Sequence, residues 1–262
     1  MATEKTLAIV LRVVEFSETS SIVTLFTREF GKIGGMAKGA RRPKSAFEFA
    51  LDLLAVCRIV FIHKSTDTLD LLTEAKLERR FRGADRGLAY VYAGYYIAEL
   101  LQELTDQNDP HPDLFDLAVQ TLGALGSGQA LAPSVLRFEM VALDLLGHLP
   151  SLQSCAECGR KMEPAARVPF GLISGGVLCR KCRPGRSNVV QVSSGVLEAF
   201  RCFAAADDQW KTFPLERAVW GELRAVLNRF LQHLLGHELN LHSVLQTFFN
   251  VPNQAPSAIQ GK

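Results

Sequence analysis

The first 80 residues alternate between apolar and polar positions in the manner of short β-strands. An apolar residue recurs at every second position in Leu7, Ile9, Leu11 and Val13, and this period of two predicts a strand with one buried face. We expect further strands at residues 22–27, 31–38, 49–63 and 69–76. Gly34 and Gly35 lie inside the third of the five and indicate a bulge or sharp bend. Five short strands with no room for crossover helices predict an antiparallel barrel or sandwich.

From about residue 84 the apolar period lengthens to 3.6, which predicts helices. The first has a stripe running from Leu88 through Tyr92 and Tyr95 to Leu104. A third helix should begin with Pro133 at its first turn and end at Gly147. The remaining helices are expected at residues 113–125, 195–205 and 214–235. The tail, residues 251–262, is small, polar and proline-containing, so we expect it to be disordered.

The composition is that of a globular protein with an ordinary hydrophobic core. The chain has 262 residues, of which 48% are hydrophobic and 21% charged, and a chain of this length needs neither disulfides nor a metal to form a core. Glu4, Arg12 and Glu15 interrupt any signal peptide. The most apolar run, residues 51–62, is too short to cross a membrane. We therefore expect a cytoplasmic protein, nucleoid-associated if it binds DNA, whose six cysteines are free thiols or metal ligands.

Charge is distributed unevenly along the chain. The formal net charge is +2. Residues 1–83 carry 14 basic and 10 acidic side chains, residues 84–150 carry 2 and 9, and residues 151–262 carry 13 and 8. Two basic regions that flank an acidic middle indicate separate surfaces for separate partners, one of them polyanionic. Alternatively, the charged residues are simply spread unevenly over solvent-exposed faces without a partner. The count alone does not decide between these two explanations.

The strongest chemical signal is a pair of C-x2-C motifs separated by 20 residues, Cys155-Ala-Glu-Cys158 and Cys179-Arg-Lys-Cys182. Each motif places two sulfurs on one side of a tight turn, and two facing turns offer four thiolates to a tetrahedral zinc ion. We predict one zinc ion held by Cys155, Cys158, Cys179 and Cys182. Four cysteines leave no open position for water, so this zinc should be structural. Cys57 and Cys202 lie in apolar segments and are expected in the core.

Two basic clusters are candidates for DNA contacts. The segment after the third strand has four cations in seven residues and no acid: Lys38, Arg41, Arg42 and Lys44. Where the barrel should end, a second cluster contains Arg79, Arg80 and Arg82. Arginine grips phosphate with two N–H groups and lysine adds a compact charge, which suits a nucleic-acid backbone. The alternative for each cluster is a solvated turn. Seven further cations lie between residues 160 and 186 and either offset the charge of the zinc cluster or contact phosphate.

No motif indicates catalysis. The chain has no Walker P-loop, no G-x-S-x-G motif and no well-placed dinucleotide fingerprint. His233 and His237 are spaced as in H-E-x-x-H but lack its glutamate. All four tyrosines lie within residues 90–96, where core or interdomain packing is a better explanation than base stacking. We therefore predict that the protein is not an enzyme.

Several segments together resemble the bacterial RecO family of DNA repair proteins. They are Ala8-Ile-Val-Leu-Arg12, the run from Ser20 to Lys32, Lys38-Gly-Ala-Arg-Arg42-Pro-Lys-Ser45, and Phe170 with Gly175-Gly-Val-Leu-Cys179-Arg-Lys-Cys182. The resemblance covers about residues 5–250. It implies an α+β chain with a five-stranded OB-fold barrel at residues 1–83 and a mainly helical domain at residues 84–250. The helical domain would carry a zinc-binding insert at about residues 151–187.

The resemblance also implies a function. A RecO-like chain would be a recombination mediator that binds single- and double-stranded DNA and anneals complementary strands. Its partners would be RecR and the single-strand-binding protein, and it would help RecA to displace the latter. Two alternatives stay open: a zinc-ribbon factor that reads a nucleic-acid sequence, and an adaptor whose basic surfaces receive acidic peptides. A mediator should bind almost any strand, whereas a sequence reader should not.

Overall fold

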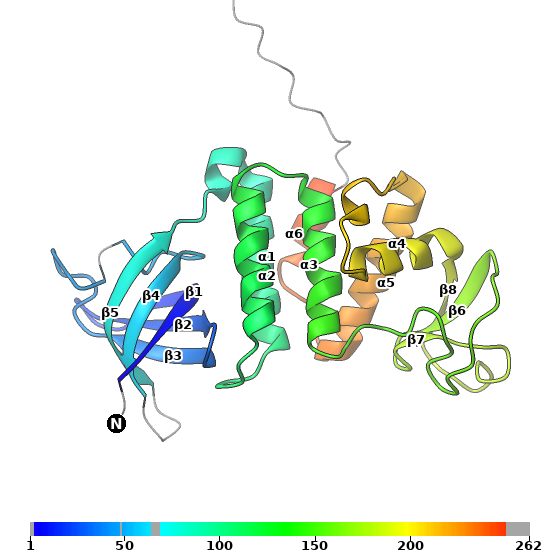
Figure 1. The fold of residues 1–262 in the computed structure, drawn as a ribbon, viewed down its shortest axis with the longest axis horizontal. Coiled ribbons are helices and arrows are strands. Elements are labelled where there is room, and N and C mark those ends of the chain that lie inside the picture. The colour runs from blue at the N-terminus through cyan, green and yellow to red at the C-terminus, as the bar shows by residue number, and fades with distance from the viewer. Residues whose placement is uncertain (1–2, 48, 64–68, 250–262) are drawn as a thin grey trace, which may run out of the picture.

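The computed structural model describes residues 3–47, 49–63 and 69–249. The tail predicted to be disordered, residues 251–262, lies outside them. A β-barrel forms one end of an elongated molecule, helices form the middle, and a small sheet with the cysteine-bearing loops forms the other end (Figure 1). Within the described residues, no helix is both long and apolar enough to cross a membrane.

The N-terminal region is a closed five-stranded barrel with the strand order β1-β2-β3-β5-β4. Its strands are β1 (Thr3–Glu15), β2 (Ser21–Thr27), β3 (Gly31–Ala37), β4 (Val56–Ile62) and β5 (Asp70–Arg79). This confirms the expected OB-fold barrel. One pair departs from the antiparallel prediction, because β3 and β5 close the barrel as parallel neighbours. The expected strand at residues 49–63 is also too long, since residues 49–54 form turns before β4 begins.

Gly34 and Gly35 do not make the bulge that the sequence suggested. The register between β2 and β3 runs without interruption past both glycines. A Cβ at Gly35 would instead collide with the side chain of Leu72, which is buried in the barrel. The glycines therefore provide space where β5 closes against β3. The bulges lie elsewhere, on β1 between Val10 and Arg12 and on the β4–β5 pair.

Strand β1 is buried on both faces, not on one. Ala8 and Val10 point into the barrel core, whereas Ile9 and Leu11 belong to the core that the barrel shares with the helices. The predicted apolar face is therefore the outer face, and it is covered by the helical region. Val13, on the same alternating series, is 39% exposed because the strand has by then left the contact.

Within the described residues, the C-terminal region contains six α-helices and a three-stranded sheet. The helices are α1 (Leu88–Leu104), α2 (Pro112–Gly126), α3 (Leu131–Leu145), α4 (Ser194–Ala204), α5 (Arg217–Leu235) and α6 (His242–Phe249). The sheet has the order β7-β6-β8 and contains β6 (Arg167–Gly171), β7 (Gly176–Val177) and β8 (Val189–Ser193). All five predicted helices are present, while α6 and the small sheet are additions that the sequence pattern did not indicate.

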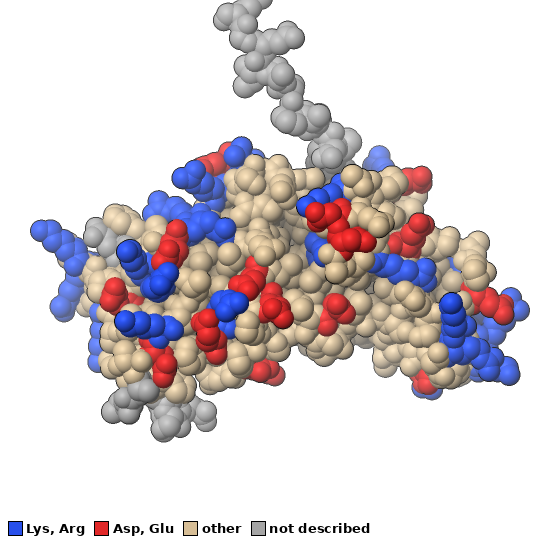
Figure 2. Space-filling model, viewed as in Figure 1, with Lys and Arg blue, Asp and Glu red and all other residues tan. Residues whose placement is uncertain are grey.

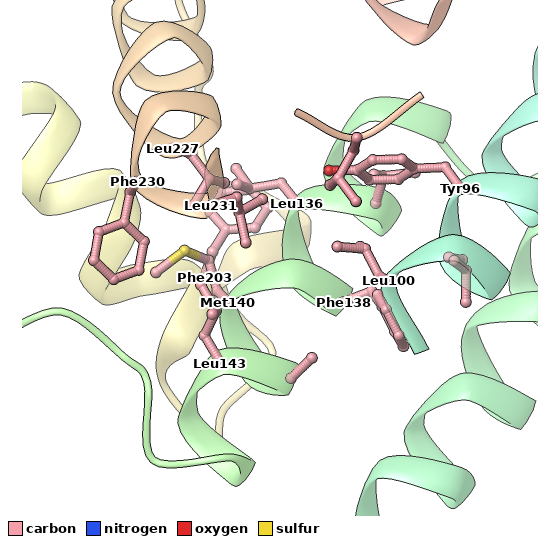
Figure 3. Close-up of a cluster of buried hydrophobic side chains, with 14 of the residues drawn as sticks. Tyr96, Leu100, Leu136, Phe138, Met140, Leu143, Phe203, Leu227, Phe230 and Leu231 are labelled. Atoms are coloured by element: carbon pink, nitrogen blue, oxygen red, sulfur yellow. The ribbon is translucent and has the colours of Figure 1, made fainter. Parts of the chain in front are cut away.

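Helix α3 is the centre of the helical core. Figure 3 shows Met140 and Leu143 facing Phe203 of α4 and Phe230 of α5, while Phe138 faces α1 on the opposite side. The stripe predicted for α1 is wrong at its start, because Leu88 is 61% exposed. The helix instead buries the adjacent face with Ala93, Tyr96, Ile97, Leu100 and Leu101.

Two buried carboxylates fix helices within this core. Glu139 of α3 accepts hydrogen bonds from the Tyr96 hydroxyl, at 2.6 Å, and from the Arg224 guanidinium. Burial and the nearby Glu139 carboxylate raise the pKa of Tyr96, so its hydroxyl stays protonated and donates. Glu99 of α1 accepts from the backbone N–H groups of Asn240 and Leu241, at 2.7 and 3.0 Å, and so fixes the chain just before α6. Breaking a buried pair of this kind typically costs about 3–5 kcal/mol.

The barrel joins the helices through the turn between β2 and β3. Arg28 forms a two-pronged pair with Asp116 of α2, with Nε–Oδ1 and Nη2–Oδ2 distances of 3.0 and 2.9 Å. The Lys32 ammonium donates to the carbonyls of Gln102 and Thr105 at the end of α1, where the negative end of the helix dipole favours a cation. A Cβ at Gly31 would collide with the backbone of Asp109. These contacts hold the barrel closely against the helices.

Candidate metal centre and nucleic-acid interface

The four predicted zinc ligands converge at the end of the molecule opposite the barrel. We call residues 151–193 the cysteine lobe. The Sγ atoms of Cys155, Cys158, Cys179 and Cys182 all lie within 4.8 Å of one another, and those of Cys158 and Cys179 are 3.9 Å apart. Four sulfurs bound at about 2.3 Å to a tetrahedral zinc ion would be about 3.8 Å apart. The residues therefore fit a four-coordinate metal ion.

Each C-x2-C motif forms a tight turn that directs its sulfurs inward. In the first, the Gly159 N–H donates to the Cys155 carbonyl at 2.8 Å, and Gly159 adopts φ +70°, a conformation that glycine reaches without strain. In the second, the N–H groups of Cys182 and Arg183 donate to the Cys179 carbonyl at 3.1 and 3.0 Å. An ion pair of 2.7 Å between Glu157 and Arg186 connects the two turns. The short sequence spacing thus becomes a four-sulfur site.

The thiols of the cluster lie in different electrostatic environments, so the pKa values of Cys155 and Cys182 shift in opposite directions. Burial alone raises the pKa of Cys155, but the backbone N–H groups of Cys179, Cys158 and Glu157 outweigh it and lower that pKa to about 6. Hydrogen bonds to Cys158 and Cys179 raise the pKa of Cys182 to about 12. Without a cation the cluster must keep protons, because adjacent thiolates repel one another. A bound divalent ion would displace these protons, and its positive charge would offset the negative charge of the thiolates.

The other two cysteines lie apart from this site, as predicted. Cys57 is fully buried in the barrel core, where burial raises its pKa to about 12. Cys202 is half-buried on α4 and packs against the helical core. The tyrosines also pack as predicted, since Tyr96 is buried in the core and Tyr92 stacks on Phe248 of α6 at 5.7 Å between ring centroids.

The predicted basic loop lies on the barrel and all four of its cations are exposed. They are Lys38, Arg41, Arg42 and Lys44. The loop rests on the turn between β1 and β2, because the Arg41 N–H donates to the Thr19 carbonyl at 3.1 Å and the Gly39 N–H to Ser20 Oγ at 3.4 Å. Among the described residues, Arg41 is the one loop cation that pairs with a carboxylate, at 2.8 Å from Glu15. We call residues 15–20 together with 38–44 the barrel tip.

The second predicted basic cluster is not part of the barrel tip. The Arg79 guanidinium donates to the Val119 carbonyl and lies over Gly123, so this side chain fastens the barrel to α2. Arg80 pairs with Asp52 at 3.3 Å, and Arg82 is exposed just before the 3-10 turn Gly83–Arg86. The barrel tip lies on the side away from the helices (Figure 1). The structure therefore separates the two clusters that the sequence had treated alike.

An exposed aromatic residue was missed by the sequence reasoning. Phe16 lies in the turn between β1 and β2 and is 62% exposed, beside the flanking Val14, which is 40% exposed. The Arg41 guanidinium also reaches the Ser17 carbonyl, at 3.4 Å, so the aromatic ring and the basic loop belong to one surface. The sequence did contain a signal for this exposed ring, namely a phenylalanine in a polar turn that connects two strands. The pattern of alternating apolar positions does not include residues in turns.

Comparison with known proteins identifies the family. The model described as "Recombination protein O N terminal" matches residues 1–81, and "Recombination protein O C terminal" matches residues 86–242. A DNA repair protein RecO from Rhodopirellula baltica is 45% identical over 88% of this chain and 94% of its own length. The chain belongs to the RecO family. RecO proteins from Anaeromyxobacter sp. (strain Fw109-5) and Salinibacter ruber are 36% and 35% identical over 90% and 87% of this chain, and over 92% and 87% of their own lengths.

Membership of the RecO family agrees with the resemblance found in the sequence, and the structure shows what the resembling segments do. The run from Ser20 to Lys32 forms β2 and the turn that joins the barrel to the helices through Arg28. The Lys38–Ser45 run forms the exposed loop of the barrel tip. The segment ending at Cys182 builds the second cysteine turn. Of these three motifs, one is thus an internal joint and the other two lie at the two ends of the molecule.

Proposed function

We propose that this RecO-family chain is a recombination mediator in DNA repair that performs no covalent chemistry. It binds single- and double-stranded DNA, anneals complementary strands, and helps to load RecA onto strands covered by single-strand-binding protein. RecR and single-strand-binding protein are its proposed direct partners. The observation that carries the proposal is the barrel tip, an exposed basic loop packed against an exposed aromatic turn at the end of an OB-type barrel.

The charge of the barrel tip suits a nucleic-acid backbone of any sequence. Among the described residues, Lys38, Arg42 and Lys44 have no carboxylate partner, so these cations are available to phosphate. Arg41 keeps free guanidinium N–H groups beside its pair with Glu15. Backbone contacts of this kind give affinity without sequence preference, which is what an annealing protein needs.

Phe16 adds a flat apolar surface to this basic region. Stacking of a base on an exposed aromatic side chain contributes about 1–3 kcal/mol and tolerates every base. A single strand offers unstacked bases, whereas a duplex hides them. We therefore propose that Phe16 favours single strands and that Lys38, Arg41, Arg42 and Lys44 serve both forms of DNA. Arg80 and Arg82 lie apart from the barrel tip and are proposed as further phosphate contacts, while Arg79 is a joint to α2.

The four cysteines are proposed to hold one structural zinc ion. Cys155, Cys158, Cys179 and Cys182 supply thiolates alone, and such a closed set of ligands suits zinc and leaves no position for a reacting water molecule. The ion would contribute folding free energy to turns that have few buried apolar side chains of their own. We also propose that residues 1–83 and 84–250 act as two domains, with the zinc-binding insert near residues 151–187.

The test is a strand-annealing assay with the wild-type chain and the triple variant Arg41→Ala, Arg42→Ala, Lys44→Ala. We expect the variant to bind and anneal weakly, with complementary strands either bare or covered by single-strand-binding protein. Each phosphate contact on a single strand contributes about 0.7 to the salt slope, so removing three of them should flatten the slope by about 2. Thermal unfolding should stay unchanged because exposed cations contribute little to stability.

A control variant removes two cations from another exposed surface. Lys211 and Arg217 lie in the 3-10 turn Gln209–Lys211 and at the start of α5, outside the barrel. Lys211→Ala with Arg217→Ala should leave annealing at the wild-type level. An unchanged salt slope in a normally folded triple variant would refute the role of the barrel tip. A strong preference for one short sequence that persists at high salt would favour a sequence-reading factor instead.

A further inference from the structure

The cysteine lobe is itself strongly basic, and the negative charge of a zinc ion with four thiolates would neutralise only part of its positive charge. The lobe contains seven Lys and Arg residues against two Glu residues, a net charge of +5. Zinc with four thiolates carries a charge of −2, which leaves +3. In the described part of the chain, two of the seven cations have carboxylate partners, Arg167 with Glu222 and Arg186 with Glu157. The remaining five are exposed, namely Arg160, Lys161, Arg180, Lys181 and Arg183.

Three of the lobe arginines line one hollow. Arg167 extends from β6, while Arg180 and Arg183 come from the second cysteine turn and its exit, and together they border a cavity of about 520 Å³. Pro169, Pro184 and Gln191 complete its walls. Arg167 is held in place, since its Nη2 donates to the Gln191 carbonyl at 2.9 Å and to Glu222 at 2.8 Å. Arg180 and Arg183 thus present guanidinium groups beside a concave surface whose shape is set by the sheet and the cysteine turn.

This hollow is well suited to a phosphodiester group. A guanidinium donates two parallel N–H groups to phosphate oxygens and needs no particular base beside them. Pro169 and Pro184 bring no N–H donors, so the polar contacts would come from the side chains around them. The charge, the concave shape and the absence of a carboxylate partner for Arg180 and Arg183 among the described residues favour a nucleic-acid backbone as occupant.

The lobe and the barrel tip are separated by the helices and by negative charge. They lie at opposite ends of the elongated molecule (Figure 1). Residues 84–150, which form the first three helices between them, carry nine acidic and two basic side chains. Figure 2 shows Lys and Arg at both ends of the face in view, with Asp and Glu among them as well as across its middle. A DNA backbone running along this face would be repelled half-way.

We propose that the cysteine lobe is a second DNA-backbone site, and that one chain therefore holds two separate DNA segments at its two ends. This inference rests on the proposed function and adds to it a physical basis for annealing. The two ends bring two strands into one neighbourhood, which raises the effective concentration of each for the other. Zinc then has an indirect part in the activity, because the second cysteine turn positions Arg180 and Arg183.

A bridging assay with two strands that cannot pair tests this inference. One strand is fixed to beads, the zinc-loaded full chain is added, and capture of a labelled, non-complementary strand is measured. We expect the wild-type chain to capture it and the double variant Arg180→Ala, Arg183→Ala to capture about tenfold less. The salt slope of capture should fall by about 1.4, since each of two phosphate contacts contributes about 0.7. Lys211→Ala with Arg217→Ala removes the same charge elsewhere and should capture normally.

Three further measurements distinguish loss of the second DNA site from other reasons for reduced capture. Binding of the bead-bound strand itself should survive in the Arg180→Ala, Arg183→Ala variant, because the barrel tip is intact. Zinc content and the mass from light scattering should equal those of the wild type, so that reduced capture reflects neither metal loss nor loss of self-association. Normal capture by the variant, or capture that falls together with mass, would overturn the second site. A wild-type chain that binds no DNA would overturn the proposed function as well.

Discussion

The barrel and the cysteine lobe both present basic surfaces, but they are stabilised in different ways. The barrel encloses its own core, in which Phe61, Ile59 and Leu25 are fully buried and Phe30 packs edge-on against Phe61 at 5.3 Å. In the lobe, the strands β6 and β8 pack on the helices, with Phe170 against Phe230 at 6.4 Å. The two cysteine turns extend beyond this contact, and Cys155 is the one cysteine of the four that is buried as a whole residue.

This difference shows that two basic surfaces of one protein can be stabilised by different interactions, one by a closed apolar core and the other by a proposed metal site. Apolar burial contributes about 25 cal/mol per Å² and needs a closed layer of side chains, which a five-stranded barrel provides. A loop of roughly 30 residues with many exposed polar positions cannot build such a layer, and the proposed metal ion would take its place. The barrel tip should therefore tolerate loss of metal, and the lobe should tolerate damage to the barrel core.

The largest effect is expected from Cys179→Ser. Removing one of four thiolates should lower the zinc content well below one ion per chain, because structural sites of this kind bind zinc with an apparent free energy of about 10–16 kcal/mol that depends on all four ligands. The lobe should lose its protection from hydrogen exchange, while β1–β5 keep theirs. Metal analysis and hydrogen exchange by mass spectrometry measure the two responses.

Cys202→Ser is the control for that variant. It removes a half-buried thiol outside the metal site, so zinc should stay at one ion per chain. If freshly purified wild-type protein contained no zinc, or if Cys179→Ser kept a full complement, the assignment of the four ligands would be wrong. If the barrel unfolded together with the lobe, the two supports would not be independent.

The reverse experiment is Phe61→Ala. Deleting a fully buried aromatic ring from a closed core typically costs about 3–5 kcal/mol, and the ring of Phe61 also supports Phe30. The barrel strands should exchange faster and the denaturant midpoint of the barrel should fall. Zinc content should not change. Simultaneous loss of metal would show that the lobe depends on the barrel after all.

The smallest effect is expected at the joint between the barrel and the helices. The Arg28 guanidinium lowers the pKa of Asp116 by hydrogen bonding to it. A carboxylate with a lowered pKa stabilises the folded state above its unfolded pKa, and this contribution disappears as the pH falls through the folded value. Arg28→Ala should therefore destabilise the protein only slightly at pH 7, because the pair is exposed to solvent.

The difference in stability between the wild type and Arg28→Ala should vanish in acid. Urea unfolding of wild type and Arg28→Ala, compared at pH 7 and below the lowered pKa of Asp116, measures it. Asp116→Asn should behave like Arg28→Ala at pH 7, and its difference from wild type should shrink over the same acid range. A gap between wild type and Arg28→Ala that widens as the pH falls would contradict this assignment.

The sequence by itself determined the local features of this protein. Period-two and period-3.6 patterns located the barrel strands and five helices, because burial on one side leaves a regular trace in the chain. The paired C-x2-C motifs predicted four converging sulfurs, because two-residue spacing dictates a tight turn around a metal ion. The family resemblance was also visible in short motifs, and the comparisons confirm it.

Only the tertiary structure decided which face of each element is covered. Ile9 and Leu11 on β1 face the helices, and Gly35 leaves room for Leu72 at the parallel closure of the barrel. Arg79 and Arg42 are equally basic in sequence, yet Arg79 donates to α2 while Arg42 remains exposed on the barrel tip. Which surface is free depends on contacts between residues far apart in the chain, and a local pattern carries no record of them.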